Sequence, residues 1–355
     1  MARRPRLALP AVLLVAVVLA AACGDDDGGT DSTATTDEAA ATTAAPAEGT
    51  TDSLTLGYSA WPGWFPLAIT EQEGIFDEVG LDVDLRFFAD YLASIEAMAS
   101  GQLDGVTQTL NDTMASVAGG SEQVIVVVND NSTGNDKIIC DASVNTVADL
   151  KGKTVAAEPG VVDHFLLVQG LQDAGLTEAD IDFRGVPTDA AAASFAAGEF
   201  DCVGVFAPFW LTALERPGSK ELFSSADYPG TIPDHIVVSR ELVDTRPEVV
   251  QKLVDAWYLT LEFMAENPER ATEIMAEVAE TSVEDYASFA EGTTLFTADE
   301  ALAAFEDGDD TTSLKYVAEL INPFLVESGF TEVEAPLDGL FDASFTSDWV
   351  DRAAG

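Results

Sequence analysis

The order of predicted strands and helices repeats along the chain, and this repetition constrains the fold more than any other feature of the sequence. A strand–helix–strand–helix–strand order runs from residue 54 to 109 and again from 154 to 206. Strands that alternate with helices form parallel sheets through right-handed crossovers. Residues 101–106 also align with residues 198–203. We predict an α/β fold of two similar lobes with open sheets; two unrelated α/β halves are the alternative.

Local patterns locate the individual elements. Short runs of alternating or continuous apolar residues predict strands, which we expect at 54–58, 83–88, 105–109, 124–128, 154–158, 181–186, 202–206 and 234–239. Apolar residues at helical spacing predict helices, which we expect from the turn after Pro66 to about 76 and at 92–99, 164–173, 190–197, 246–280 and 313–327.

Two segments carry the chain from one half to the other, so we expect a hinge. We assign residues 53–130 and 236–355 to lobe one and residues 131–235 to lobe two. The helical region after residue 245 should pack on lobe one as a C-terminal extension. Because ligands of open α/β sheets bind at the loops that follow the strands, we predict a ligand cleft between the lobes.

The N-terminal residues predict secretion. Residues 1–22 place three arginines before an apolar run and small residues, which is typical of a signal peptide. The run Leu19-Ala20-Ala21-Ala22-Cys23 resembles a bacterial lipobox, in which the cysteine is acylated; ordinary cleavage near Ala22 is the alternative. Residues 23–52 lack aromatic side chains and predict a disordered linker. We expect a protein held on the outer face of the cytoplasmic membrane, at the cell surface or in the periplasm, by its lipid alone.

Composition and motifs exclude several classes of function. A formal net charge of −47 argues against nucleic acid as a partner. The only histidines, His164 and His235, lie far apart in the sequence, so we expect no metal site and no cofactor. Ser59 follows a strand, but the tight turn of a nucleophile elbow is missing because Trp61 replaces its second glycine. We therefore expect a binding protein rather than an enzyme.

Two further cysteines, Cys140 and Cys202, follow Cys23. An even number in a secreted protein is compatible with a disulfide. Two buried free thiols are the alternative.

Four segments together resemble the nitrate, sulfonate and taurine class of substrate-binding proteins that serve ABC importers. They are Gly57-Tyr58-Ser59-Ala60-Trp61-Pro62-Gly63-Trp64, Glu73-Gly74-Ile75-Phe76, Ala99-Ser100-Gly101-Gln102-Leu103-Asp104 and Asp149-Leu150-Lys151-Gly152-Lys153-Thr154-Val155-Ala156. The resemblance covers residues 54 to about 345. It implies a type II periplasmic-binding-protein fold whose lobes close on the ligand and signal an ABC transporter permease.

A narrower resemblance implies the chemistry of the ligand. It rests on Gln108-Thr109-Leu110-Asn111-Asp112-Thr113, Val161-Val162-Asp163-His164-Phe165, Phe206-Ala207-Pro208-Phe209 and Ile232-Pro233-Asp234-His235. These segments resemble a branch whose genes accompany urea carboxylase-type enzymes. That resemblance implies urea or guanidine as ligand.

Loops at the predicted strand ends supply the candidate ligand-binding residues. They are Trp61, Trp64, Asp90, Tyr91, Asn111, Asp112, Asp163, His164, Phe209 and Asp234. The alternatives are structural: tryptophans can clasp a helix, and aspartates commonly cap helix N-termini. Aromatic faces and carboxylates without a lysine or arginine in the same loops favour a planar cation.

The sequence thus predicts a receptor, expected to be monomeric, that delivers a small nitrogen compound to an ABC importer, with guanidine or urea as first choice. An anion receptor for taurine, aliphatic sulfonate or nitrate is the alternative within the same class. An extracellular enzyme on the same fold is the alternative from another class.

Overall fold

The computed structural model describes residues 52–354, which belong to one compact unit. The predicted signal peptide, Cys23 and all but the last residue of the predicted linker lie outside these residues. Within the described part of the chain, no helix has both the length and the apolar character needed to cross a bilayer.

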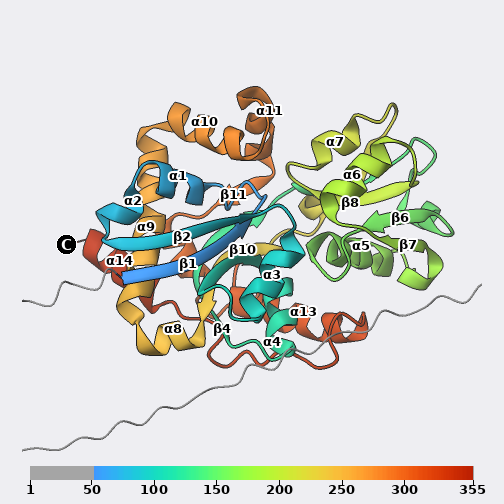
Figure 1. The fold of residues 1–355 in the computed structure, drawn as a ribbon. Helices are drawn as coiled ribbons and strands as arrows, with labels where there is room; N and C mark the ends of the chain where they lie inside the picture. Colours follow the sequence, from blue (N-terminus) through green and yellow to red (C-terminus); the bar gives the residue numbers. More distant parts are fainter. Residues whose placement is uncertain (1–51, 355) are drawn as a thin grey trace, which may run out of the picture. The chain divides into compact units, whose positions relative to one another are not determined.

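The first sheet has six strands in the order β11-β4-β10-β3-β1-β2 (Figure 1). These strands are β1 (Asp52–Ser59), β2 (Leu81–Phe88), β3 (Gly105–Thr109), β4 (Gln123–Ser132), β10 (Pro233–Ser239) and β11 (Thr293–Leu295). β1, β2 and β3 are parallel, whereas β10 runs antiparallel to both β3 and β4. The valine-rich run of β4 is buried on both faces, as expected for an inner strand.

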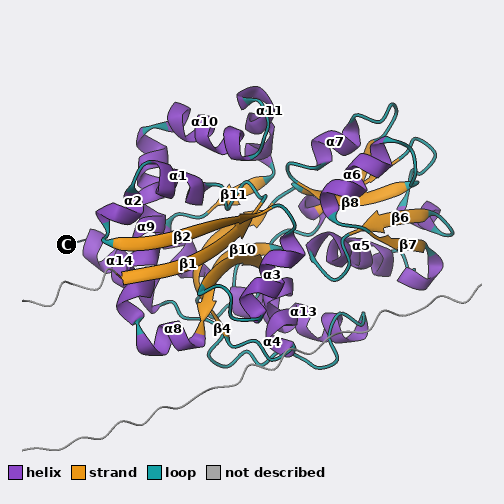
Figure 2. Ribbon diagram, viewed as in Figure 1, coloured by secondary structure: helices purple, strands orange, loops and turns teal. Residues whose placement is uncertain are grey.

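The second sheet has five strands in the order β7-β6-β8-β5-β9 (Figure 2). They are β5 (Asp136–Cys140), β6 (Thr154–Ala157), β7 (Asp182–Gly185), β8 (Cys202–Phe206) and β9 (Lys220–Ser224). β6, β7 and β8 are parallel, and β5 is antiparallel to β8. The order β7-β6-β8-β5 therefore repeats the order β2-β1-β3-β10 of the first sheet, as the duplicated sequence pattern predicts.

Helices cover both faces of the first sheet. α3 (Tyr91–Ala99) and α4 (Leu110–Ala118) pack on one face, and α13 (Leu314–Glu327) packs on α4. The long α9 (Pro247–Glu266) contacts β1, β2 and β4, and Figure 1 shows α1 and α10 gathered around it. The remaining helices of this lobe are α1 (Pro66–Gln72), α2 (Ile75–Glu78), α8 (Arg240–Thr245), α10 (Pro268–Val278), α11 (Val283–Ala287), α12 (Ala298–Ala304) and α14 (Ser344–Ala353). The C-terminal helices thus extend lobe one, as predicted.

Three helices cover the second sheet. α5 (Val162–Asp173) contacts β5 and β8, while α6 (Thr188–Ala196) and α7 (Trp210–Leu214) pack on each other and on β8. Figure 2 shows α5 on one side of this sheet and α6 with α7 on the other. The fold is the predicted two-lobed α/β arrangement of type II periplasmic-binding proteins.

The chain crosses between the sheets twice, between β4 and β5 and between β9 and β10. Each crossing supplies the antiparallel strand next to the parallel strands of the sheet that it enters. Asp234 and His235 already pair with β3 and β4, so the structure places them in the first sheet. Our predicted boundary at residue 235 assigned them to lobe two.

The two cysteines of lobe two form a disulfide in the structure. Cys140 of β5 lies opposite Cys202 of β8 in the antiparallel register, and their sulfurs are bonded. Both residues are fully buried. The bond ties the strand that enters lobe two to the third parallel strand of that lobe.

Candidate ligand-binding site

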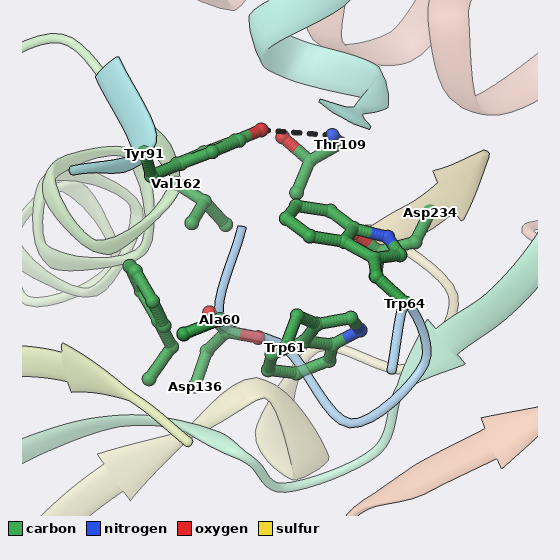
Figure 3. A pocket seen from close by; sticks show the side chains of 9 residues that line it. Ala60, Trp61, Trp64, Tyr91, Thr109, Asp136, Val162 and Asp234 are labelled. Carbon is green, nitrogen blue, oxygen red and sulfur yellow. Dashed lines mark hydrogen bonds between the residues drawn. The ribbon is translucent and has the colours of Figure 1, made fainter. Parts of the chain in front are cut away.

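A small cavity lies where strand ends of the two sheets meet (Figure 3). It is lined by Ala60, Trp61, Trp64, Tyr91, Thr109, Asp136, Val162, Phe206 and Asp234. Six of these residues belong to the first lobe, and three come from β5, α5 and β8 of the second. The cavity is smaller than the roughly 300–1,000 Å³ typical of sites for drug-sized ligands. Its size therefore argues against a drug-sized ligand.

The turn after β1 places two tryptophans against the cavity. The Trp61 indole nitrogen donates a hydrogen bond to Asp130 Oδ1 over 3.0 Å, and the two indole rings lie 6.4 Å apart. Gly63 sits between them because a Cβ at this position would lie 1.8 Å from Asp130 Oδ2. Asp130 thus fixes the turn. Figure 3 shows the two rings that this turn carries.

Tyr91, the first residue of α3, forms another aromatic wall. Its hydroxyl donates to Asp112 Oδ2 over 2.8 Å and accepts from the Thr109 backbone N–H over 3.0 Å, the bond dashed in Figure 3. Its ring centroid lies 5.3 Å from that of Trp64 and 6.1 Å from that of Phe206. Hydrogen bonds at one end and packed rings at the other leave this side chain little freedom.

Two predicted site residues next to Tyr91 do not reach the cavity. Asp112 accepts hydrogen bonds from the Tyr91 and Thr109 hydroxyls and from the Asn111 side-chain nitrogen. Burial raises the pKa of Asp112 to about 7. The Asn111 side-chain oxygen lies 2.7 Å from Thr109 Oγ1 and completes the network. Asn111 and Asp112 therefore support the wall from behind and do not face a ligand.

Asp163 and His164, at the start of α5, also have internal partners. Asp163 accepts from the backbone N–H groups of Glu158 and His164, and burial raises its pKa well above the usual range. The His164 ring stacks on Phe183, and its Nε2 contacts Glu178 Oε2. Neither residue lines the cavity.

Asp90 and Phe209, two further predicted residues, line a neighbouring cavity instead. Asp90 is the N-cap of α3 and accepts from the Ala93 backbone N–H over 3.1 Å, so the helix-capping alternative applies to it. Phe209 packs edge-on against Phe206. This second cavity shares Ala60, Tyr91 and Phe206 with the first.

Two of the residues that line the first cavity are acidic. Among the described residues, Asp136 Oδ2 and both side-chain oxygens of Asp234 have no hydrogen-bond donor. Each residue is about 1% exposed. Burial raises the pKa of Asp136 to about 7, and burial together with the neighbouring Asp130 raises that of Asp234 well above the usual range. The site therefore offers acceptors that the protein itself leaves unused.

Positive charge is not built into these walls. None of the nine lining residues is a lysine, arginine or histidine. Lys137 follows Asp136, but its amine pairs with Glu221 over 2.6 Å. Burial lowers the pKa of the nearby His235 to about 3, so this ring is neutral at physiological pH. The one lining donor without a partner in the described chain is the Trp64 indole nitrogen.

The structure brings four of the predicted site residues together at the cavity: Trp61, Trp64, Tyr91 and Asp234. Sequence reasoning missed Asp136 and Phe206. Asp136 follows the first crossing as Asp234 follows the second, and that correspondence was the available signal. Phe206 is the last residue of β8. Which side chains of β8 face inward depends on its pairing register with β5.

Residues 47–280 match the sequence profile of the NMT1-like family. The chain belongs to this family. A protein of Brucella abortus (strain 2308) that is named as a binding protein is 26% identical over 275 residues, covering 76% of this chain and 83% of the relative.

Solved structures support the fold assignment of this NMT1-like chain. The periplasmic aliphatic sulphonate binding protein SsuA from Escherichia coli superposes with a TM-score of 0.67 at 19% identity, covering 81% of this chain and 91% of SsuA. The desulfurization enzyme DSZB superposes with a TM-score of 0.59 at 14% identity, covering 85% and 99%. Both a binding protein and an enzyme thus share this fold, so function must be argued from the site.

Proposed function

We propose that this chain is an extracytoplasmic solute receptor for an ABC importer and that its ligand is a small planar nitrogen compound, guanidine first and urea second. Its NMT1-like family, its two-lobed fold and a relative named as a binding protein support the receptor role. The nature of the cavity walls supports the choice of ligand.

One observation carries the ligand proposal: the buried residues Asp136 and Asp234 line the cavity, and no donor among the described residues bonds to Asp136 Oδ2 or to either side-chain oxygen of Asp234. A buried acceptor without a partner costs free energy, roughly 1–3 kcal/mol. Guanidinium has N–H donors around its whole edge and can pair with carboxylates bidentately. Indole and phenol rings stabilise a cation on their faces. The ligand would thus satisfy the oxygens and cover the rings at the same time.

The two carboxylates come from different lobes, which links binding to closure. Asp136 begins β5 of the second sheet, and Asp234 lies on β10 of the first. A cation between them attracts both in their charged form, whereas without it burial and mutual repulsion favour their protonated form. Only a ligand that prefers the closed arrangement shifts the population of lobes toward it. Guanidinium would therefore stabilise the closed form that an importer recognises.

Urea is the second candidate because it has the same planar shape without the charge. Its N–H groups match the carboxylates, and its carbonyl oxygen could accept from the Trp64 indole N–H, the unpartnered lining donor of the described chain. Guanidinium gains more from the carboxylates because its hydrogen bonds to them are charge-assisted on both sides.

An anion receptor for taurine, aliphatic sulfonate or nitrate is the alternative, and the likeness to SsuA favours it. An anion would need helix N-termini to outweigh the carboxylates. Asp112 and Asp163 already lie in the first turns of α4 and α5. Asp163 also accepts from the His164 backbone N–H, a group that an anion would need.

An extracellular enzyme on the same fold is the other alternative, since DSZB shares it. The nine lining residues include no cysteine, histidine, lysine or serine, so Asp136 and Asp234 would have to serve as nucleophile or base. Conversion of a ligand during incubation with the purified protein would favour this alternative.

The proposal also covers how the receptor is anchored and how it passes its ligand to the importer. Acylation of Cys23 would anchor the receptor to the outer face of the cytoplasmic membrane, and residues 24–51 would tether the lobes to that anchor. The receptor would act as a monomer and hand its ligand to the permease of the importer.

A thermal-shift panel tests the proposed function. The mature protein is melted with guanidine, urea, taurine, an alkanesulfonate and nitrate at matched ionic strength. A ligand at 100 times its Kd stabilises the folded state by about 2.7 kcal/mol, which corresponds to a rise in Tm of roughly 5 °C for a protein of this size. We expect guanidine to give the largest rise. Stabilisation by sulfonate or nitrate alone would contradict the cationic proposal and leave the receptor role standing.

A further inference from the structure

A second small cavity adjoins the ligand cavity and differs from it in character. The two share only Ala60, Tyr91 and Phe206. Its other walls include three acidic residues, Asp90, Glu158 and Asp189, and no basic residue. We call the ligand cavity the inner cavity and this neighbour the outer cavity.

The shared aromatic rings separate the two cavities. Tyr91 and Phe206 lie edge to face, with ring centroids 6.1 Å apart and planes at 83°. Tyr91 comes from α3 of the first lobe and Phe206 from the end of β8 in the second. We call this pair of rings the partition. It is complete only when the two lobes are in contact.

A hydrogen bond between the two lobes, next to the partition, stabilises the contact between Tyr91 and Phe206. Glu158 Oε1 accepts from the Leu92 backbone N–H over 3.2 Å, and its Oε2 accepts from the Thr188 hydroxyl over 2.8 Å. Leu92 directly follows Tyr91, so the bond ties the first turn of α3 to the second lobe. Closure thus positions Tyr91 against Phe206.

The outer cavity also contains an unused polar group. Ser59 lines it, is 1% exposed, and its hydroxyl has no hydrogen-bond partner among the described residues. The hydroxyl lies near carboxylates and away from basic side chains, so these walls favour a group that donates hydrogen bonds and carries positive charge.

We propose that Tyr91 and Phe206 determine ligand size: they confine an unsubstituted guanidinium to the inner cavity and block a substituent from the outer one. Removing the Phe206 ring would join the cavities. The joined space would accept a guanidine whose substituent ends in an ammonium group, because the acidic outer walls attract that charge. This inference rests on the proposed function.

The test compares three ligands by isothermal titration calorimetry on the mature wild type and on Phe206→Ala. They are guanidine, agmatine, which is a guanidine with an ammonium-ended chain, and 4-guanidinobutyrate, whose chain of similar length ends in a carboxylate. The wild type should prefer guanidine to agmatine by at least about tenfold. The variant should bind guanidine more weakly but gain at least about tenfold in agmatine affinity, the size of one charge-assisted hydrogen bond. Its affinity for 4-guanidinobutyrate should not rise.

Phe223→Ala is the matched control, because Phe223 is a buried phenylalanine of the same sheet that lines neither cavity. It should keep the wild-type preference. Phe206→Leu, which removes less volume, replaces the alanine variant if circular dichroism shows that the latter does not fold, and it should show a smaller gain for agmatine.

Each outcome separates the two proposals. No response of the wild type to guanidine or urea refutes the proposed function, and this inference with it. Wild-type binding of guanidine and agmatine with equal affinity refutes the partition alone. A folded Phe206 variant that gains nothing for agmatine, or gains equally for 4-guanidinobutyrate, also refutes the partition while leaving the proposed function intact.

Discussion

Replacing Asp136 by asparagine should make the empty protein more stable and its ligand binding weaker. Burial raises the pKa of Asp136 from 3.8 to about 7, so the folded state holds the carboxyl proton more tightly than the unfolded chain. The charged form is then a cost to folding that appears as pH rises from about 4 to about 7. At about 1.4 kcal/mol per pKa unit, the cost approaches about 4 kcal/mol at pH 7.

Asparagine removes this cost but keeps a polar group that must still be buried. We therefore expect Asp136→Asn to raise the free energy of unfolding by about 1–4 kcal/mol at pH 7, and by much less near pH 4, where both states of the wild type are protonated. The same change removes a charge-assisted hydrogen bond to guanidinium, about 1.5–3 kcal/mol. The Kd for guanidine should rise roughly 10- to 150-fold.

Thermal melts at several pH values, without denaturant or ligand, measure stability. Calorimetric titration with guanidine measures affinity. Asp112→Asn is the control, because burial also raises the pKa of Asp112 to about 7 while three side-chain donors satisfy its oxygens. Losing that network should cost about 1–3 kcal/mol, so the control should gain less stability at pH 7 than Asp136→Asn does. A destabilised Asp136→Asn variant at pH 7, or one with unchanged guanidine affinity, would refute the reasoning.

Three further predictions follow from the same contacts. Guanidine affinity should increase as pH rises through about 7, because the cation displaces protons from Asp136 and Asp234; calorimetry in two buffers should detect proton release, and a pH-independent Kd would contradict this. Gly63→Ala should destabilise the fold by about 1–3 kcal/mol in chemical denaturation, since its Cβ would lie 1.8 Å from an Asp130 oxygen; wild-type stability would contradict the placement of that turn. Reducing the Cys140–Cys202 bond, which closes a loop across 62 residues, should cost up to about 4 kcal/mol; two free thiols beyond Cys23 in the unfolded, unreduced protein would reject the bond.

Sequence patterns were sufficient to predict the elements whose burial is set by local periodicity. The predicted strands at 105–109 and 202–206 coincide with β3 and β8, and the repeated order of elements corresponds to the matching order of strands in both sheets. The predicted helical region 246–280 forms two helices, α9 and α10, and Pro247 and Pro268 lie early in them, as expected from the sequence. A proline at this position starts a helix and cannot continue one.

The cavity was harder to predict because it depends on which way each side chain turns. Trp61 and Trp64 were identifiable, since two large aromatic residues in one strand-end loop need a partner surface. Asp112 and Asp163 were expected at the ligand, but local donors turn their carboxylates inward. Asp136 was missed because a polar residue beside a crossing looks solvent-exposed until the first lobe closes over it.

The most direct measurement is a crystal structure of the mature protein grown with saturating guanidinium. We predict the ion in the inner cavity, its nitrogens about 2.7–2.9 Å from the carboxylate oxygens of Asp136 and Asp234 and its face against an indole or phenol ring. An inner cavity without the ion at saturation, or one that holds a sulfonate or nitrate with these carboxylates turned away, would contradict the account.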